Sequence, residues 1–125
     1  MEKQISAGLK TTFLVHIIVG VIFGLSMLLY PQLWSAFGVE LKEPEMYRLV
    51  GAAILGFTAS SWWAYKETLL EKVKIVVQME MVWTTLAALV ILWGLLFAGL
   101  PAIEWVNALL MAGFAIAFSY FYSRA

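Results

Sequence analysis

The stretch from Ile75 to Gly99 reads IVVQMEMVWTTLAALVILWGLLFAG, an apolar run interrupted near its start by Gln78 and Glu80. It is long enough to cross a hydrocarbon layer of about 30 Å, which takes roughly 20 helical residues. Its residues do not alternate between apolar and polar as the strands of a membrane barrel do. A helix also satisfies its own backbone hydrogen bonds, as lipid requires. The run therefore predicts a transmembrane helix that carries a carboxylate inside the membrane.

Three further apolar segments have similar lengths. Together the predicted spans cover about residues 9–30, 46–65, 75–99 and 102–122. Hydrophobic residues make up 63% of the 125-residue chain and charged residues only 13%, a composition far from that of ordinary soluble domains. A soluble domain this short has too much surface for its volume to bury so many apolar side chains. We therefore expect an integral protein of the plasma membrane.

The connections between the spans complete the predicted fold. Pro31 and Pro44 bracket the segment PQLWSAFGVELKEP between the first two spans. Its apolar residues suit the membrane interface and its charged residues suit water, so we expect a short interfacial segment there. No linker divides the chain. The predicted fold is all-α, with residues 1–125 forming a single domain in which four transmembrane helices make an up-down-up-down bundle.

Basic residues set the predicted orientation of this bundle. If the N-terminus lies in the cytoplasm, every Lys and Arg except Lys42 and Arg48 lies on the cytoplasmic side. Positive residues collect on that side of multi-pass membrane proteins. Both chain termini are therefore expected in the cytoplasm.

Charge and composition narrow the function classes. The formal net charge is zero, which argues against nucleic acid as a partner. The chain has no cysteine and a single histidine, so it offers no thiol chemistry and no evident set of metal ligands. We expect no metal and no cofactor. The expected partners are membrane lipid, a hydrophobic small molecule and a second copy of the chain.

Polar side chains recur at one depth in all four predicted spans. Counted from the nearest cytoplasmic Lys or Arg, His16 and Glu80 lie equally far along their helices, about 9 Å in at 1.5 Å per residue. The other two spans offer serine or tyrosine at similar depth. The sequence thus predicts a polar layer inside the membrane. Its candidate binding residues are His16, Ser60, Glu80, Trp83, Thr84, Ser119 and Tyr120.

Small residues predict the faces on which membrane helices approach one another. Gly20 and Gly24 form the GxxxG motif GVIFG, on the same helical stripe as His16. Gly56 lies on a stripe of small residues in the second span, and Gly113 lies in the alanine-rich fourth span. These four glycines are the candidate positions for helix packing.

Two interpretations of the intramembrane carboxylate are open. A charged or titratable group at this depth is costly and is a candidate functional group by default. In the first interpretation, His16 and Glu80 form a proton-titratable pair. In the second, Glu80 makes hydrogen bonds to Ser60, Thr84 or His16 that fix the register of the helices, or its side chain reaches toward the cytoplasmic interface.

A second polar cluster is possible at the outer side, where Arg48 and Glu104 open their helices. A pair between them could close the outer mouth of the bundle or hold an anionic headgroup. The alternative is that both are solvated helix ends, with Glu104 favoured by the helix dipole and Arg48 reaching toward water.

The layout of the first two spans resembles a known group of proteins. The first span ends in LLYPQLWSAFG, a charged loop follows, and the second span reads YRLVGAAILGFTASSWWA. Over about residues 13–95 this pattern is similar to that of small four-helix prokaryotic membrane proteins, which include DoxX-like and uncharacterised families. The resemblance implies a four-helix bundle and no established activity.

Two function classes fit these features. The first is a non-catalytic module that binds lipid or another hydrophobic ligand, or that assembles with membrane proteins. The alternative is a small proton-linked transporter or channel that uses Glu80 and His16. The two differ in whether Glu80 faces a water-accessible cavity or a dry helix contact. An enzyme is not expected, because the chain has so few catalytic groups, although acid–base chemistry on a lipid by Glu80 and Tyr120 stays open.

Overall fold

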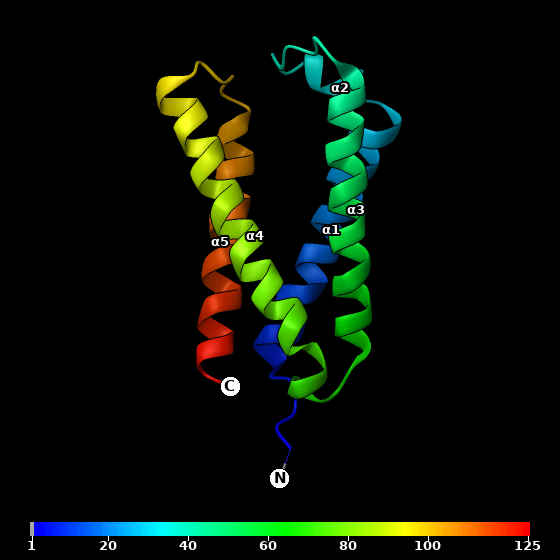
Figure 1. The fold of residues 1–125 in the computed structure, drawn as a ribbon, viewed down its shortest axis with the longest axis vertical. Helices are drawn as coiled ribbons and strands as arrows, with labels where there is room; N and C mark the ends of the chain where they lie inside the picture. Colours follow the sequence, from blue (N-terminus) through cyan, green and yellow to red (C-terminus); the bar gives the residue numbers. More distant parts are fainter. Residues whose placement is uncertain (1) are drawn as a thin grey trace.

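The computed structural model describes residues 2–125, and this part of the chain is helical, as the sequence predicts (Figure 1). It contains five helices and no β-strand; one isolated bridge joins Gln4 to Leu69. The helices are α1 (Ala7–Leu29), α2 (Gln32–Ser35), α3 (Pro44–Lys66), α4 (Leu70–Phe97) and α5 (Glu104–Ser123).

Three of the helices, α1, α4 and α5, are long and apolar enough to cross a membrane. Helix α3 has the same length as α1, 23 residues, but is more polar. It carries Glu45 and Arg48 near its start, Lys66 at its end, and hydroxyl side chains in between. The three apolar helices are compatible with a membrane protein.

Local sequence signals explain where the helices begin and end. The Ser6 hydroxyl caps α1 by accepting a hydrogen bond from the backbone N–H of Leu9 at 3.2 Å. Pro44 occupies the first turn of α3, where its missing N–H costs nothing. Helix α4 ends just before Gly99, which adopts a φ of 71° that suits glycine, and the chain turns there toward α5.

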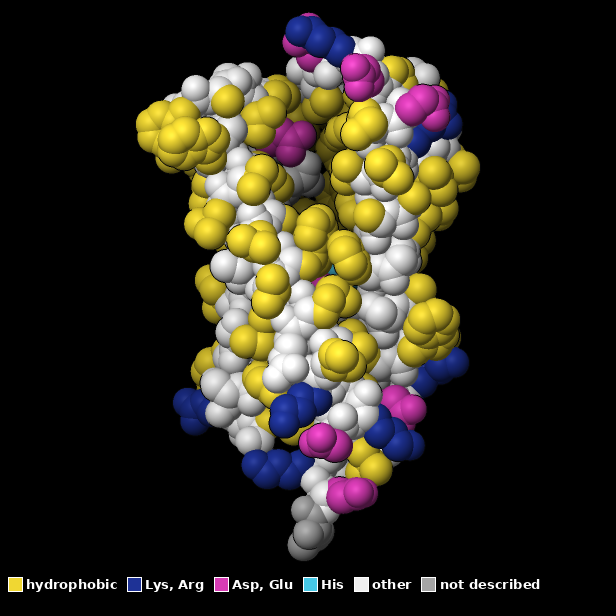
Figure 2. All heavy atoms as spheres, in the orientation of Figure 1, with side chains coloured by type: hydrophobic (Ala, Val, Ile, Leu, Met, Phe, Trp, Pro, Cys, Tyr) yellow, Lys and Arg dark blue, Asp and Glu magenta, His cyan; other side chains and the backbone are white. Residues whose placement is uncertain are grey.

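The four long helices form two antiparallel pairs, α1 with α3 and α4 with α5. The pairs converge at the end that holds both termini and diverge toward the other end (Figure 1). Figure 2 shows the resulting hollow between the pairs at the diverging end, with most of the basic side chains at the opposite end. The short helix α2 lies beside α3 at the diverging end.

A close backbone approach holds the α1–α3 pair together. A Cβ added at Gly51 would lie 2.7 Å from the backbone nitrogen of Leu28 and 2.8 Å from the carbonyl oxygen of Gly24. A Cβ added at Gly20 would collide with the Thr58 hydroxyl. Glycine is therefore required where these two helices cross, as in other membrane helix contacts built on small residues.

The two pairs are joined at the converging end by a small apolar core. The rings of Phe13 and Phe118 lie 5.3 Å apart, and Leu9 and Val77 are fully buried beside them. The N-terminal segment adds backbone hydrogen bonds to the α3–α4 connection, from Ile5 N–H to the Thr68 oxygen and from Leu70 N–H to the Lys3 oxygen.

Candidate functional site

Three side chains from three different helices meet next to this core. His16 of α1 lies between Ser61 of α3 and Glu80 of α4. Its Nε2 atom is 3.3 Å from Glu80 Oε2, and its Nδ1 atom is 2.9 Å from Ser61 Oγ. The Ser61 hydroxyl in turn donates to Glu80 Oε1 at 3.3 Å. The three contacts close a ring, which we call the polar ring.

The polar ring is sealed from solvent. Ser61 and Glu80 are 0% exposed and His16 is 4% exposed. Helix α5 covers the imidazole with the rings of Phe114 and Phe118, whose centroids lie 5.0 and 5.9 Å from that of His16, in edge-on arrangements. The ring therefore lies in a dry contact between helices, where an uncompensated charge is costly.

Regular spacing brings the ring residues onto the inner faces of their helices. On α1, Thr12, His16, Gly20 and Gly24 are all buried and recur every fourth residue. The buried residues of α4 are Val73, Val77, Glu80, Thr84, Ala88 and Gly94, again spaced by three, four or six. The Thr84 hydroxyl donates to the backbone oxygen of Glu80 at 2.6 Å and so leaves the carboxyl group to the ring.

A count of protons shows what the polar ring can do chemically. Each of its three close contacts joins two electronegative atoms, so each needs one proton to be attractive. The hydroxyl of Ser61 supplies one proton, and His16 and Glu80 must together supply two. The fully bonded ring is therefore neutral overall, either as imidazolium with carboxylate or as imidazole with carboxylic acid. With one proton fewer, the ring has a net charge of −1 and one contact in which two lone pairs face each other.

The contact between the imidazole and the carboxyl group is the one of the three without hydrogen-bond geometry. Glu80 Oε2 makes no aligned hydrogen bond and has only the Nε2 atom of His16 nearby, at 3.3 Å. A proton shared between these two atoms can belong to either partner.

The other residues predicted for the polar layer lie elsewhere. The Ser60 hydroxyl donates to the Phe57 oxygen of its own helix, and the Trp83 ring packs at a tilt against the Phe57 ring, with the centroids 4.8 Å apart. Tyr120 is half exposed and has Arg124 over its ring. Ser119 is partly buried near the end of α5, and among the described residues it makes no side-chain hydrogen bond to the ring.

Ser61 was not a candidate in the sequence, which offered Ser60 at nearly the same depth. The buried residues of α3 are Gly51, Thr58, Ser61 and Ala64. Successive residues of this set are seven, three and three positions apart. These spacings place them on one side of the helix. The stripe of small residues at every fourth position instead drifts around the helix, from the exposed Ala52 and Gly56 to the buried Ala64, and so does not follow the buried face. Ser61 lies three residues after the buried Thr58 and three before the buried Ala64, and so falls on the buried face.

The ring contacts predict different effects for the two neighbouring serines. We expect Ser61→Ala to lower the free energy of unfolding by about 1–3 kcal/mol, because His16 Nδ1 and Glu80 Oε1 then lack a partner in a buried site. Ser60→Ala is expected to change it by less than about 0.5 kcal/mol, since its hydroxyl bonds only within α3. Reversible unfolding in mixed detergent micelles measures both. Equal losses for the two variants would contradict the polar ring.

At the diverging end, Arg48 and Glu104 have separate partners. Arg48 donates from Nη1 to the Leu28 oxygen at 3.0 Å, and its Nε lies 3.5 Å from a carboxylate oxygen of Glu45. Glu104 accepts a hydrogen bond of 2.7 Å from the side-chain amide of Asn107. Arg48 therefore ties the start of α3 to the end of α1, whereas Glu104 is bonded to a side chain one turn further along its own helix.

The four candidate packing glycines divide into two groups. Gly20 and Gly24 are buried, and a Cβ on either would meet side chains of α3. Around Gly56 and Gly113 there is open space, with nothing within 4 Å of an added Cβ. Among the described residues, neither glycine of the second group is therefore in contact with a neighbouring helix.

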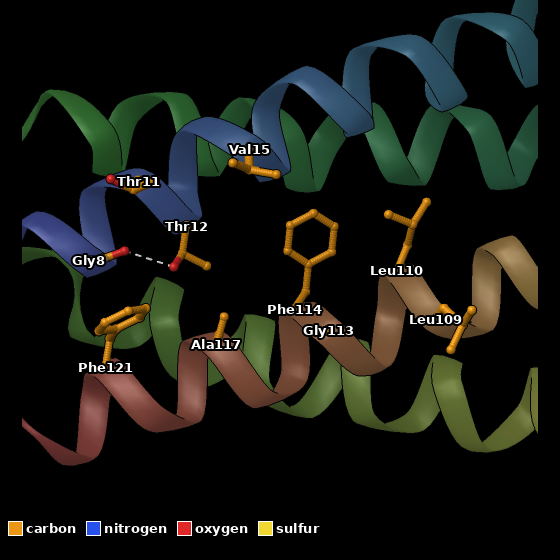
Figure 3. A pocket seen from close by; sticks show the side chains of 10 residues that line it. All are labelled: Gly8, Thr11, Thr12, Val15, Leu109, Leu110, Gly113, Phe114, Ala117 and Phe121. Carbon is orange, nitrogen blue, oxygen red and sulfur yellow. Dashed lines mark hydrogen bonds between the residues drawn. The ribbon is translucent and has the colours of Figure 1, made fainter.

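Gly113 lines an apolar groove between α1 and α5, with a volume of about 430 Å³ (Figure 3). The hydroxyls of Thr11 and Thr12 donate to the carbonyl oxygens of Ala7 and Gly8, at 2.9 and 2.8 Å, so neither needs a ligand. The lining residues are Gly8, Thr11, Thr12, Val15, Leu109, Leu110, Gly113, Phe114, Ala117 and Phe121.

Comparison with protein-family models, curated proteins and solved structures gives no match for this chain. The resemblance to DoxX-like and related small membrane proteins therefore stays a prediction. The function has to be argued from the polar ring and the groove.

Proposed function

We propose that this chain is a four-helix transmembrane bundle that binds a lipid or another hydrophobic molecule in the groove between α1 and α5, without catalysing a reaction. The observation that carries the proposal is the groove itself. It lies between two helices that are each long and apolar enough to span a membrane, and it presents no unpaired hydroxyl to a ligand. Its volume is in the range of about 300–1,000 Å³ that small-molecule sites occupy.

The position of the groove suits a ligand that is dissolved in the membrane. Figure 3 shows the side chains of Leu110 and Phe114 directed from α5 into the space between the two helices, with Val15 on α1 and Phe121 at one end. A molecule in the lipid phase reaches this space sideways, without passing through water. An acyl chain or a similarly apolar molecule is the ligand that such a lining favours.

The proposal includes α3 as the fourth span. Its 23 residues extend for about 35 Å at 1.5 Å per residue, enough to cross the hydrocarbon layer. The hydroxyls of Thr58 and Ser61 are buried against other helices, whereas Leu49, Trp62 and Trp63 are exposed. The surface that α3 would present to lipid is thus more apolar than its overall composition.

The basic residues support an orientation with both termini in the cytoplasm. The two termini lie at the same end of the molecule, and most basic side chains gather there in Figure 2. Positive residues favour the cytoplasmic side. The hollow between the helix pairs would then open toward the outer side.

Burial of the polar ring favours binding over proton-linked transport. Transport that is driven by protonation of Glu80 requires its carboxyl group to be exposed to water in the pathway of the substrate. The Glu80 side chain is 0% exposed and its carboxyl oxygens face His16 and Ser61. The same burial separates the titratable groups from the groove, which argues against acid–base chemistry on a ligand there.

Filling the groove tests the proposed function. We expect Gly113→Phe to reduce photocrosslinking of a diazirine-labelled fatty acid to residues 109–121 about tenfold in proteoliposomes, because the new ring occupies the groove; a tenfold change corresponds to about 1.4 kcal/mol of binding. Open space around Gly113 lets the protein accept the substitution.

The matched control is Gly56→Phe, since Gly56 also has open space but lies on α3, outside the groove. This variant should retain crosslinking at residues 109–121. Crosslinks spread evenly over the exposed faces of the wild-type helices, or equal labelling of both variants, would overturn the proposed ligand site.

A further inference from the structure

We propose that the polar ring is a proton-binding site whose single exchangeable proton holds the α1–α3 pair against the α4–α5 pair. When this proton leaves for bulk water, neutral imidazole and carboxylate remain and the junction between the pairs weakens. The inference concerns the junction and does not depend on what the groove binds.

The polar ring spans the junction between the two pairs. His16 and Ser61 belong to one pair and Glu80 to the other, so two of the three contacts cross from pair to pair. Toward the diverging end, the buried glycines of α1 face α3 and not the second pair. Among the described residues, the His16–Glu80 and Ser61–Glu80 contacts are the side-chain polar contacts that join α1 or α3 directly to α4 or α5.

Among residues 2–125, no other charged side chain pairs with the ring to compensate a charge on it. Helix α1 contributes His16 and α4 contributes Glu80, whereas α3 contributes the hydroxyl of Ser61. The contacts from α5 are the aromatic rings of residues 114 and 118. Lys10, the nearest lysine along α1, lies over the Tyr65 ring at 5.5 Å. Among the described residues, the neutral two-proton state of the histidine and glutamate is thus the one the site accommodates.

The sign of the pH dependence follows from the proton count. Hydrated histidine exchanges its proton near pH 6.5 and hydrated glutamate near pH 4.3, so between about pH 4.3 and 6.5 the separated pairs also carry two protons. Above about pH 6.5 the separated state carries only one, and closing the junction takes up a proton. Each further pH unit then favours separation up to tenfold. Below about pH 4.3 the separated state binds a third proton and is favoured again.

Distance measurements between the helix pairs test this inference. The chain has no cysteine, so spin labels can be placed at Leu29→Cys and Phe97→Cys, exposed positions (68% and 69%) at the ends of α1 and α4. In lipid nanodiscs we expect one narrow distance distribution at pH 5–6. Above pH 6.5 a longer-distance population should grow up to tenfold per pH unit relative to the short one.

The variant Glu80→Gln removes the exchangeable proton of the ring and keeps the shape of the side chain. A glutamine amide donates to a neutral imidazole and accepts from Ser61, so all three contacts persist without an exchangeable proton. This variant should keep the narrow distribution from pH 5 to 9, whereas Glu104→Gln, outside the ring, should behave as wild type. Labels within one pair, at Leu29→Cys and Leu49→Cys, should show no pH response and so confirm that the pair is intact.

Two outcomes would overturn the inference. One is a wild-type distribution that stays unchanged from pH 5 to 9. The other is the same pH response in Glu80→Gln as in wild type. Because neither measurement involves a ligand, both outcomes leave the test of the α1–α5 groove unaffected.

Discussion

Replacing His16 with leucine is expected to lower the free energy of unfolding by about 3 kcal/mol, the upper end of the cost of leaving a buried polar group without its partner. Leucine is apolar and of similar size, so the packing against Phe114 and Phe118 is largely kept. The loss comes from Glu80, which remains 0% exposed with Ser61 as its only side-chain partner.

The double variant His16→Leu with Glu80→Leu is the decisive control. Replacing both members of a buried pair by apolar residues is often neutral or stabilising, so most of the lost stability should return. Unfolding in mixed detergent micelles, followed by circular dichroism, gives all values of the double-mutant cycle. Losses that simply add would show that the two side chains do not interact.

The second large effect is expected at Gly51, where α3 crosses α1. Gly51→Ala should lower the free energy of unfolding by about 1–3 kcal/mol, since overpacking forces the backbone to shift. The methyl group would meet backbone atoms of Gly24 and Leu28, which cannot rotate away as a flexible side chain can.

Gly56→Ala provides the comparison on the same helix. Its methyl group meets open space, and alanine favours a helix over glycine by up to about 1 kcal/mol, so this variant should be as stable as wild type or more so. The same micelle unfolding assay measures both. A loss at Gly56 as large as that at Gly51 would contradict the crossing of α1 and α3.

Much of the helical framework was predictable from the sequence, because a long apolar run in lipid has few alternatives to a helix. Depth along the helices also placed His16 and Glu80 at one level. Counting along each helix cannot show which helices are neighbours, so it could not establish that these two residues meet. It also gives Ser60 and Ser61 almost the same depth in the membrane. Only their angular positions around α3 distinguish them.

The groove and the divergence of the two pairs could not be predicted. In a soluble protein, apolar residues mark the buried face of a helix. In a membrane, lipid tails are as apolar as leucine, so apolar residues do not distinguish a buried face from a face exposed to lipid. Gly20 and Gly113 therefore look alike in the sequence, although one is buried in a helix crossing and the other borders open space. At the diverging end, the partners of Arg48 and Glu104 were uncertain because long side chains choose among several nearby oxygens.

The most direct test of the polar ring is solid-state NMR of the protein in lipid bilayers with ¹⁵N-labelled histidine and ¹³C-labelled glutamate. His16 is the chain's single histidine, so its two ring nitrogens give an assigned signal. We predict through-space contact between a ring nitrogen and a glutamate carboxyl carbon, and loss of that contact in Glu80→Gln. An imidazole that titrates near pH 6.5 like a hydrated histidine, with no carboxyl carbon nearby, would contradict the ring and the junction built on it.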